Sequence, residues 1–188
     1  RRSAIRPFPG MDQINTTQAA HVSGQGLHYM DVTSATERVA VFGNKFFEDV
    51  AGVWTDRTGS ITIGVGDLVQ FIDYQQGANR FLIGAPGGGN APFKWTGTGN
   101  AAALGGSPPN FNTVGKLHDL TLGAVNEIVY FSDNGDAETW DITNWVIPYD
   151  KDVFLILEHG SKTAILMEDH IGSLQGFNEL DLLQEENE

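Results

Sequence analysis

The feature that most constrains the fold is a series of short apolar runs, rich in Val, Ile, Phe and Tyr, separated by turn-forming residues. The 188 residues include 23 Gly and 7 Pro, which are spread between the runs along the whole chain. Such runs are typical of β-strands joined by tight turns. No segment keeps a helical period for three turns, and the nearest approach is residues 174–183. The sequence therefore predicts an all-β fold with little helix.

The expected strands recur in four groups, which begin near residues 27, 68, 113 and 145. In the first two groups, a strand is followed by a turn, an apolar run that starts with Arg, a second turn, and a strand that carries Lys beside aromatic residues. The last two groups repeat this order more loosely. One further strand is expected at residues 60–63. Periods of roughly 40 residues are typical of β-propellers, whose blades are small antiparallel sheets of four strands.

The chain is accordingly expected to have three parts. Residues 27–172 form a propeller-like array of about four blades, residues 1–26 form an N-terminal arm, and residues 173–188 form an acidic C-terminal tail. The arm carries Arg1, Arg2 and Arg6. Opposite charges at the two ends of one chain suit head-to-tail assembly, so these arginines are candidate interaction residues for the acidic half of a neighbouring subunit.

Charge is distributed very unevenly. The chain has 24 acidic and 11 basic residues, for a net charge of −13, and the whole excess lies in residues 95–188. A surplus of carboxylates argues against nonspecific binding to nucleic acid or anionic lipid, which needs a basic surface. No apolar run approaches the ~20 residues of a membrane span, and no membrane partner is expected. The acidic half is expected to have one of two roles. It forms a solvated surface, or it forms a surface that faces a basic partner or a passage for DNA.

The motifs of enzymes and cofactor sites do not occur in the sequence. There is no Cys, the five His lack metal-ligand spacing, and the Gly-rich stretch 84–90 has no Gly-Lys-Ser/Thr. A Gly-x-Ser-x-Gly elbow is also missing. The sequence predicts no catalytic residue, no metal site and no cofactor, and hence a protein that is not an enzyme.

One acidic stretch, Ser-Asp-Asn-Gly-Asp-Ala-Glu-Thr-Trp at residues 132–140, has three interpretations. Asp133, Asp136 and Glu138 could supply oxygen ligands to calcium, although the spacing fits no EF-hand loop. The stretch also has the residue types of the Asp-box turn of sialidase-type propellers, with a Gly-to-Thr spacing that is too long. We favour a structural turn in which Gly135 adopts a positive φ and Trp140 packs between blades. Weak calcium or sugar binding at residues 133–138 remains open.

Three segments occur in a recognisable order: Asn-Ala-Pro-Phe-Lys-Trp-Thr-Gly at 90–97, Ala-Leu-Gly-Gly-Ser-Pro-Pro at 103–109, and Ile-Val-Tyr-Phe-Ser-Asp-Asn-Gly-Asp-Ala-Glu-Thr-Trp at 128–140. In this order they resemble a family of propeller-like virion proteins of tailed bacteriophages, and the resemblance extends over roughly residues 27–170. The chain departs from the family pattern at residues 141–145, where the run into the next strand is shorter.

The resemblance implies a non-enzymatic structural role in the virion, in a tail nozzle, hub or head-to-tail ring. Implied partners are further copies of the chain and other virion proteins such as portal, adaptor or tail proteins, with DNA only as passing cargo.

A second hypothesis, from a different class, is a carbohydrate-binding or host-receptor propeller. In it Trp54, Trp95, Trp140 and Trp145 are stacking platforms for sugars. A glycosidase is a third hypothesis, but the sequence has no identifiable carboxylate pair for it.

Overall fold

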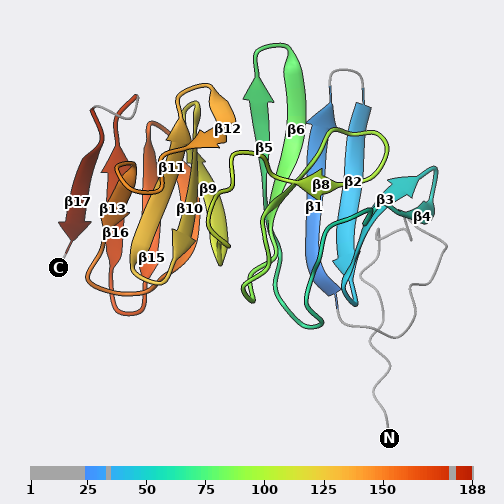
Figure 1. Cartoon of the computed structure of the whole chain (residues 1–188), viewed down its shortest axis with the longest axis horizontal. Helices are drawn as coiled ribbons and strands as arrows, with labels where there is room; N and C mark the ends of the chain where they lie inside the picture. The colour runs from blue at the N-terminus through green and yellow to red at the C-terminus, as the bar shows by residue number, and fades with distance from the viewer. Residues whose placement is uncertain (1–23, 33–34, 178–180, 188) are drawn as a thin grey trace, which may run out of the picture.

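The structure, a computed structural model, describes residues 24–32, 35–177 and 181–187, and in these residues it is all-β without helix. The strands form four separate antiparallel sheets (Figure 1). This confirms the expected fold class: a propeller-like array of four small antiparallel sheets. We call the sheets blades 1 to 4, in chain order.

Blades 1 and 2 are four-stranded meanders in which each strand pairs with the next. Blade 1 consists of β1 (Gly24–Val32), β2 (Ala35–Phe42), β3 (Lys45–Val50) and β4 (Val53–Asp56). Blade 2 consists of β5 (Gln70–Gln76), β6 (Asn79–Ala85), β7 (Phe93–Trp95) and β8 (Ala102–Ala103).

Blades 3 and 4 follow the same plan, with one added strand in blade 3. Blade 3 consists of β9 (Thr113–Leu117), β10 (Leu120–Val125), β11 (Ile128–Asp133), β12 (Asp136–Trp140) and β13 (Val146–Pro148), where both β12 and β13 pair with β11. Blade 4 consists of β14 (Val153–His159), β15 (Lys162–Met167), β16 (Ile171–Gln175) and β17 (Leu183–Asn187).

The blades begin at Gly24, Gln70, Thr113 and Val153, so consecutive blades start roughly 40 to 46 residues apart. The expected start of the fourth group near residue 145 is wrong, because residues 146–148 pair with β11 and complete blade 3. The strand expected at residues 60–63 is also wrong, since these residues form a turn and a loop. The segment expected to be a separate acidic tail contains β17, which pairs with β16 and so belongs to blade 4.

Several neighbouring strands are joined by two-residue turns, and backbone conformation explains the residues of these turns. Gly43 and Asn44, between β2 and β3, have φ values of 52° and 74°. A two-residue hairpin of this kind needs positive φ at both positions, which Gly and Asn tolerate best. Gly135, between β11 and β12, has a φ of 75°, as expected from the sequence. Local turn chemistry therefore sets where each strand ends.

The first strand of each blade lies on the inside of the array. β1 packs against β5, β5 against β9, and β9 against β14, so the blades follow one another in chain order. Figure 1 shows blade 1 at one end of the long axis and blade 4 at the other, so the array does not close into a ring. The inner strands β1, β5, β9 and β14 therefore share one side of the molecule.

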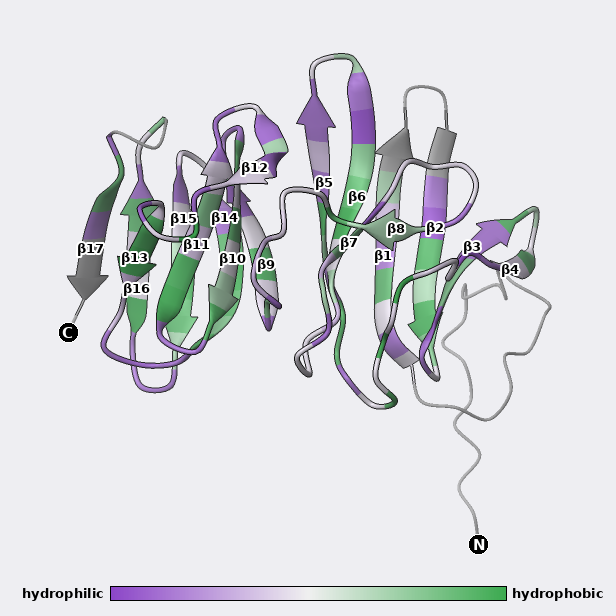
Figure 2. Cartoon of the chain, in the orientation of Figure 1, coloured by the Kyte–Doolittle hydropathy of each residue, from purple (hydrophilic) through white to green (hydrophobic). Residues whose placement is uncertain are grey.

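Three apolar clusters fill the seams between neighbouring blades. The first seam, between blades 1 and 2, is built around Phe46, Phe93 and Trp95. The middle seam contains Tyr74, Ile83, Leu104, Phe111 and Ala137. The last seam contains Leu117, Leu120, Leu122, Val129, Ile156, Ile165 and Leu174. Figure 2 shows polar residues at the ends of β5 and β6 next to the turn that joins them, in contrast to the apolar middle of β10 and β11. The core is therefore a series of seams and not one central cluster.

Candidate functional site

The three segments that carry the resemblance meet in the middle seam. β7 supplies Lys94 from the first segment, the turn after β8 supplies Gly105 from the second, and β12 supplies Glu138 from the third. Glu138 accepts hydrogen bonds from both partners: Lys94 Nζ lies 2.5 Å from its Oε2, and the backbone N of Gly105 lies 2.8 Å from its Oε1. One carboxylate thus joins three segments that are far apart in the sequence. We call this arrangement the Glu138 junction.

The two glycines of the second segment are needed for this approach. A Cβ at Gly105 would overlap the carboxylate of Glu138, and a Cβ at Gly106 would overlap the backbone of the same residue. Gly106 also has a φ of 75°, which strains any residue with a side chain. The Gly-Gly pair therefore lets the turn of blade 2 lie directly on β12 of blade 3.

The acidic turn at residues 133–138 uses its carboxylates within the protein. Asp133 accepts a hydrogen bond from the backbone N of Asn134, and Asp136 accepts from the backbone N of Glu138 and from Gln76 of blade 2. The bond from the Glu138 backbone is the main reason that the pKa of Asp136 lies below its usual value. In the described part of the chain, no group of three or more His, Cys, Asp or Glu could hold a metal ion. The hydrogen bonds of Asp133 and Asp136 are those of a structural turn.

Tyr74 adds a further polar link across the middle seam. Its hydroxyl donates to the backbone carbonyl of Asp119 over 2.5 Å. Burial raises the pKa of this hydroxyl, and the negative charges of Asp119, Asp136 and Asp133 raise it further. Tyr74 therefore acts as a neutral donor that joins blade 2 to blade 3.

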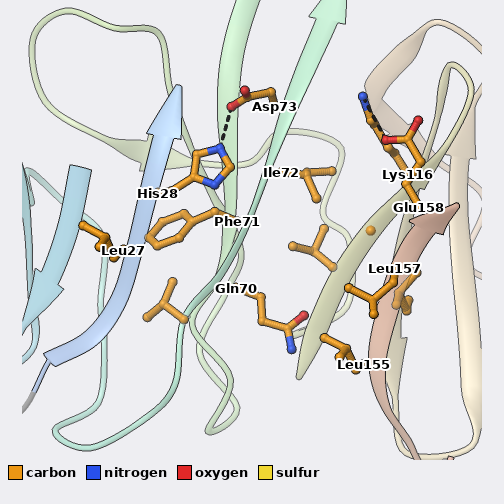
Figure 3. A pocket seen from close by; sticks show the side chains of 14 residues that line it. Leu27, His28, Gln70, Phe71, Ile72, Asp73, Lys116, Leu155, Leu157 and Glu158 are labelled. Atoms are coloured by element: carbon orange, nitrogen blue, oxygen red, sulfur yellow. Dashed lines mark hydrogen bonds and ion pairs between the residues drawn. The ribbon is translucent and has the colours of Figure 1, made fainter. Parts of the chain in front are cut away.

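A cleft of about 500 Å³ runs along the inner strands and is lined by all four blades (Figure 3). Its apolar wall includes Leu27, Phe71, Ile72, Leu155 and Leu157. The cleft lies where a closed propeller has its central channel, because the innermost strand of each blade faces the axis of such a fold.

Two polar pairs lie in the cleft, one a His–Asp hydrogen bond and one a Lys–Glu ion pair, and each joins neighbouring blades. His28 Nε2 of β1 lies 2.8 Å from Asp73 Oδ1 of β5, and Lys116 Nζ of β9 lies 3.3 Å from Glu158 Oε2 of β14. Figure 3 shows the two pairs on opposite sides, with apolar side chains between them. Going around the inner strands, the blades therefore present basic, acidic, basic and acidic side chains in turn.

Gln70 of β5 makes polar contacts with the two blades that follow it. The hydroxyl of Thr113 donates to the side-chain carbonyl of Gln70. The side-chain amide nitrogen of Gln70 donates to the backbone carbonyl of Phe154 over 3.5 Å. Gln70 therefore links blade 2 to blades 3 and 4. The inner strands are held together by hydrogen bonds as well as by apolar packing.

Three of the four tryptophans, Trp95, Trp140 and Trp145, lie in or beside the seams. Trp95 is only 1% exposed, and its indole N donates to the backbone carbonyl of Gly99. Trp140 is half-buried against Phe111 in the middle seam, as expected for a residue between blades, and Trp145 stacks on Phe131. Trp54 is half-buried and meets Phe42 edge-on, with ring centroids 5.4 Å apart. Trp95 thus offers no face to a sugar. Arg1, Arg2 and Arg6 lie outside the described residues.

Sequence reasoning did not foresee the partners within the cleft or the junction. The sequence predicts no individual role for Lys94, although it is the one basic residue between positions 81 and 115. That isolation was the available signal for a specific role. His28, Asp73 and Gln70 carry no such signal, because strand residues from different blades become neighbours only when the blades pack.

The sequence was compared with protein-family models and with curated proteins. No protein-family model matches the sequence, and no curated protein matches it significantly. Among the described residues, no helix is long and apolar enough to cross a membrane.

Proposed function

We propose that the protein is a non-enzymatic structural component of a tailed-phage virion, in a tail nozzle, hub or head-to-tail ring. The observation that carries this proposal is the Glu138 junction. The three segments that resemble the phage family meet there, and their chemistry is used to fix one blade on the next. A scaffold needs this use of charged residues, whereas a catalyst needs charged groups that remain available to a substrate.

The distribution of charge supports the same role. On the inner strands Glu158 is neutralised by Lys116 and Asp73 is hydrogen-bonded to His28, and the excess of carboxylates in residues 95–188 has no matching excess of bases. A surface of this kind repels the phosphates of DNA. In the proposed role, DNA passes as cargo and is not bound, and the contacts that matter are with copies of the chain and with portal, adaptor or tail proteins.

The carbohydrate-binding alternative has less support. It relies on aromatic platforms, but Trp95 is buried and Trp140 and Trp145 each pack against another aromatic ring. A glycan array tests this alternative directly. Specific sugar binding that is lost on Trp54→Ala would favour it over the scaffold.

The direct test of the proposal is the composition and labelling of phage particles. Particles of the phage that encodes the chain are purified by density gradient, and their peptides are identified by mass spectrometry. We expect peptides of this chain at a constant ratio to portal protein, and immunogold labelling confined to the tail or the head-to-tail region. Detection of the chain only in the lysate of infected cells, and not in particles, would contradict the proposal.

A further inference from the structure

The turn between β11 and β12 carries a reactive pair of residues, Asn134 and Gly135. Asn134 is the only asparagine in the chain that is followed by glycine. It is exposed at the tip of the hairpin, and in the described part of the chain its side-chain amide makes no hydrogen bond. By contrast, the side chain of Asn144 donates to Asp141 over 2.7 Å. The carboxamide of Asn134 is therefore free to turn towards its own backbone.

The backbone nitrogen of Gly135 is sterically accessible. A Cβ added to this residue would meet no atom within 4 Å beyond its neighbours in the chain. Because glycine has no side chain, nothing shields its nitrogen from the Cγ atom of Asn134. The amide of Gly135 donates to the backbone carbonyl of Asp119 over 3.1 Å, so attack by the nitrogen requires this bond to open. Surface turns open locally at much lower cost than the whole fold, so both reacting groups become available in the folded protein.

We propose that Asn134 is a site of self-modification, at which the chain converts asparagine into isoaspartate and aspartate. The nitrogen of Gly135 bonds to Cγ of Asn134, the bond between Cγ and Nδ2 breaks, and ammonia leaves with the proton of the Gly135 amide. The cyclic imide that results then takes up one water molecule. Cleavage between the nitrogen and Cγ gives aspartate. Cleavage between the nitrogen and the main-chain carbonyl carbon gives isoaspartate, whose main chain runs through Cβ and Cγ.

The product changes the geometry of the turn. Only Asn134 and Gly135 join the two strands, since Asp133 pairs with Asp136. In isoaspartate the main chain is longer by one carbon atom, and the length of a hairpin turn helps to set the register of its strands. The new carboxylate also follows Asp133 directly, and like charges repel. The start of β12 is therefore expected to shift.

The same turn is coupled to the seam between blades 2 and 3. Asp136, directly after the turn, accepts a hydrogen bond from Gln76 of blade 2. Glu138 lies two residues further on and accepts from Lys94 and Gly105 in the Glu138 junction. A shift of β12 moves both carboxylates relative to blade 2, so we expect isoaspartate in the turn to weaken the middle seam. This inference goes beyond the scaffold role and does not depend on it.

Ageing of the purified full chain tests the modification. The folded chain is incubated in mildly alkaline buffer, which favours loss of the amide proton. Mass spectrometry with electron-transfer fragmentation then distinguishes isoaspartate from aspartate in its peptides. We expect product at Asn134 at least about tenfold faster than at Asn144, which is held by a hydrogen bond and is followed by Trp. Asn134→Gln is the matched control and should give no product, because its longer side chain would have to close a larger ring.

Urea denaturation of fresh and aged protein tests the effect on the seam. We expect the urea midpoint of the parent chain to fall on ageing, and that of Asn134→Gln to stay unchanged. In Lys94→Met the Glu138 junction lacks one partner before ageing begins, so the further fall should be smaller than in the parent chain.

Several results would overturn the inference. Product at residue 134 that forms only in the urea-unfolded chain would show that the folded turn is fully protected. Equal rates at Asn134 and Asn144 would show that the turn has no special reactivity. A midpoint that does not fall on ageing, or that falls equally in Asn134→Gln or in Lys94→Met, would show that the product does not act on the junction. These outcomes are separate from the particle test above, because the reaction is followed in the purified chain.

Discussion

The first and last seams have the same architecture but different side chains. In the first seam, Phe46 lies edge-on to both Phe93 and Trp95, with ring centroids 5.4 and 5.6 Å apart. The last seam is dominated by Leu, Ile and Val, and the ring of Phe131 stacks on Trp145 beside them. Aromatic rings depend on mutual orientation, whereas aliphatic side chains can adapt to one another. The comparison indicates that blade packing requires apolar volume. The first seam fills that volume with aromatic rings, and the last seam fills it mainly with aliphatic side chains.

The largest expected effect is the loss of the central ring of the first seam. Phe46→Ala should lower the free energy of unfolding by about 3–5 kcal/mol, because it leaves a cavity between three aromatic rings. Urea denaturation followed by tryptophan fluorescence measures this loss. In the last seam, the volume-conserving change Leu122→Met should cost less than about 1.5 kcal/mol. If Phe46→Leu and Leu122→Met lowered the free energy of unfolding equally, the first seam would depend no more on side-chain orientation than the last seam does.

A smaller effect is expected where the last seam leaves no room for a side chain. Gly115 on β9 lies against Ile156 of β14, and an added Cβ would lie 2.7 Å from the Cβ of Ile156. Gly115→Ala should destabilise the protein by about 1–3 kcal/mol, since the two inner strands must move apart. Gly24→Ala is the matched control, because its Cβ would make only ordinary contact with Phe42.

A double-mutant cycle shows whether this clash is with Ile156. Gly115→Ala combined with Ile156→Ala should cost less than the sum of the two single changes, because the smaller side chain makes room for the new methyl group. Strict additivity would show that the space around Gly115 is limited by other atoms.

The third prediction concerns the middle seam, where the ion pair of Lys94 with Glu138 joins blades 2 and 3. Lys94→Met should lower stability by about 1–2 kcal/mol, because it removes a charge-assisted hydrogen bond and leaves the carboxylate of Glu138 with the backbone of Gly105 alone. The side chains of the pair are less than a third exposed. Thermal unfolding at low and high salt measures the effect. Adding Glu138→Gln should restore part of the loss, and a failure to do so would mean that Lys94 acts mainly by packing on Phe81.

The smallest expected effect is acid sensitivity in blade 1. The side-chain hydrogen bond from Lys45 is the main reason that the pKa of Asp56 falls from 3.8 to about 2. Because the folded-state pKa is depressed, the stabilisation is present above pH 3.8 and is lost as the pH falls towards about 2. The pair is exposed, so we expect less than about 1 kcal/mol. The urea midpoint between about pH 5 and pH 2 should fall less in Lys45→Met than in the parent chain, and an identical fall would contradict the assignment.

Much of the fold could be predicted because strands and turns are local. The hairpin at Gly43 and Asn44 follows from the φ values that these residues tolerate, and the runs in blades 1 and 2 follow a regular pattern. The assignment of residues 146–148 could not be predicted in this way. Their apolar character suits a strand in either blade, and only the pairing with β11 decides that they belong to blade 3. β17 was missed for the same reason, because its polar sequence becomes a strand only beside β16.

The candidate site could be predicted only in part. The sequence supplied the three segments and the turn at Gly135, since turn chemistry is visible in the order of residues. It gave no indication that Glu138 would join Lys94 to Gly105, because these residues come together only through the packing of blade 2 on blade 3.

By itself, the sequence determined the class of fold, the repeat of about four blades and the excess of negative charge in the second half of the chain. These properties depend on residue order and composition over short distances. The tertiary structure alone decided that His28 pairs with Asp73, that Lys116 pairs with Glu158, and that the outer faces of blades 1 and 4 have no blade against them. The physical reason is that one strand can present the same side chains to any neighbour, and the identity of that neighbour is fixed only when whole sheets pack.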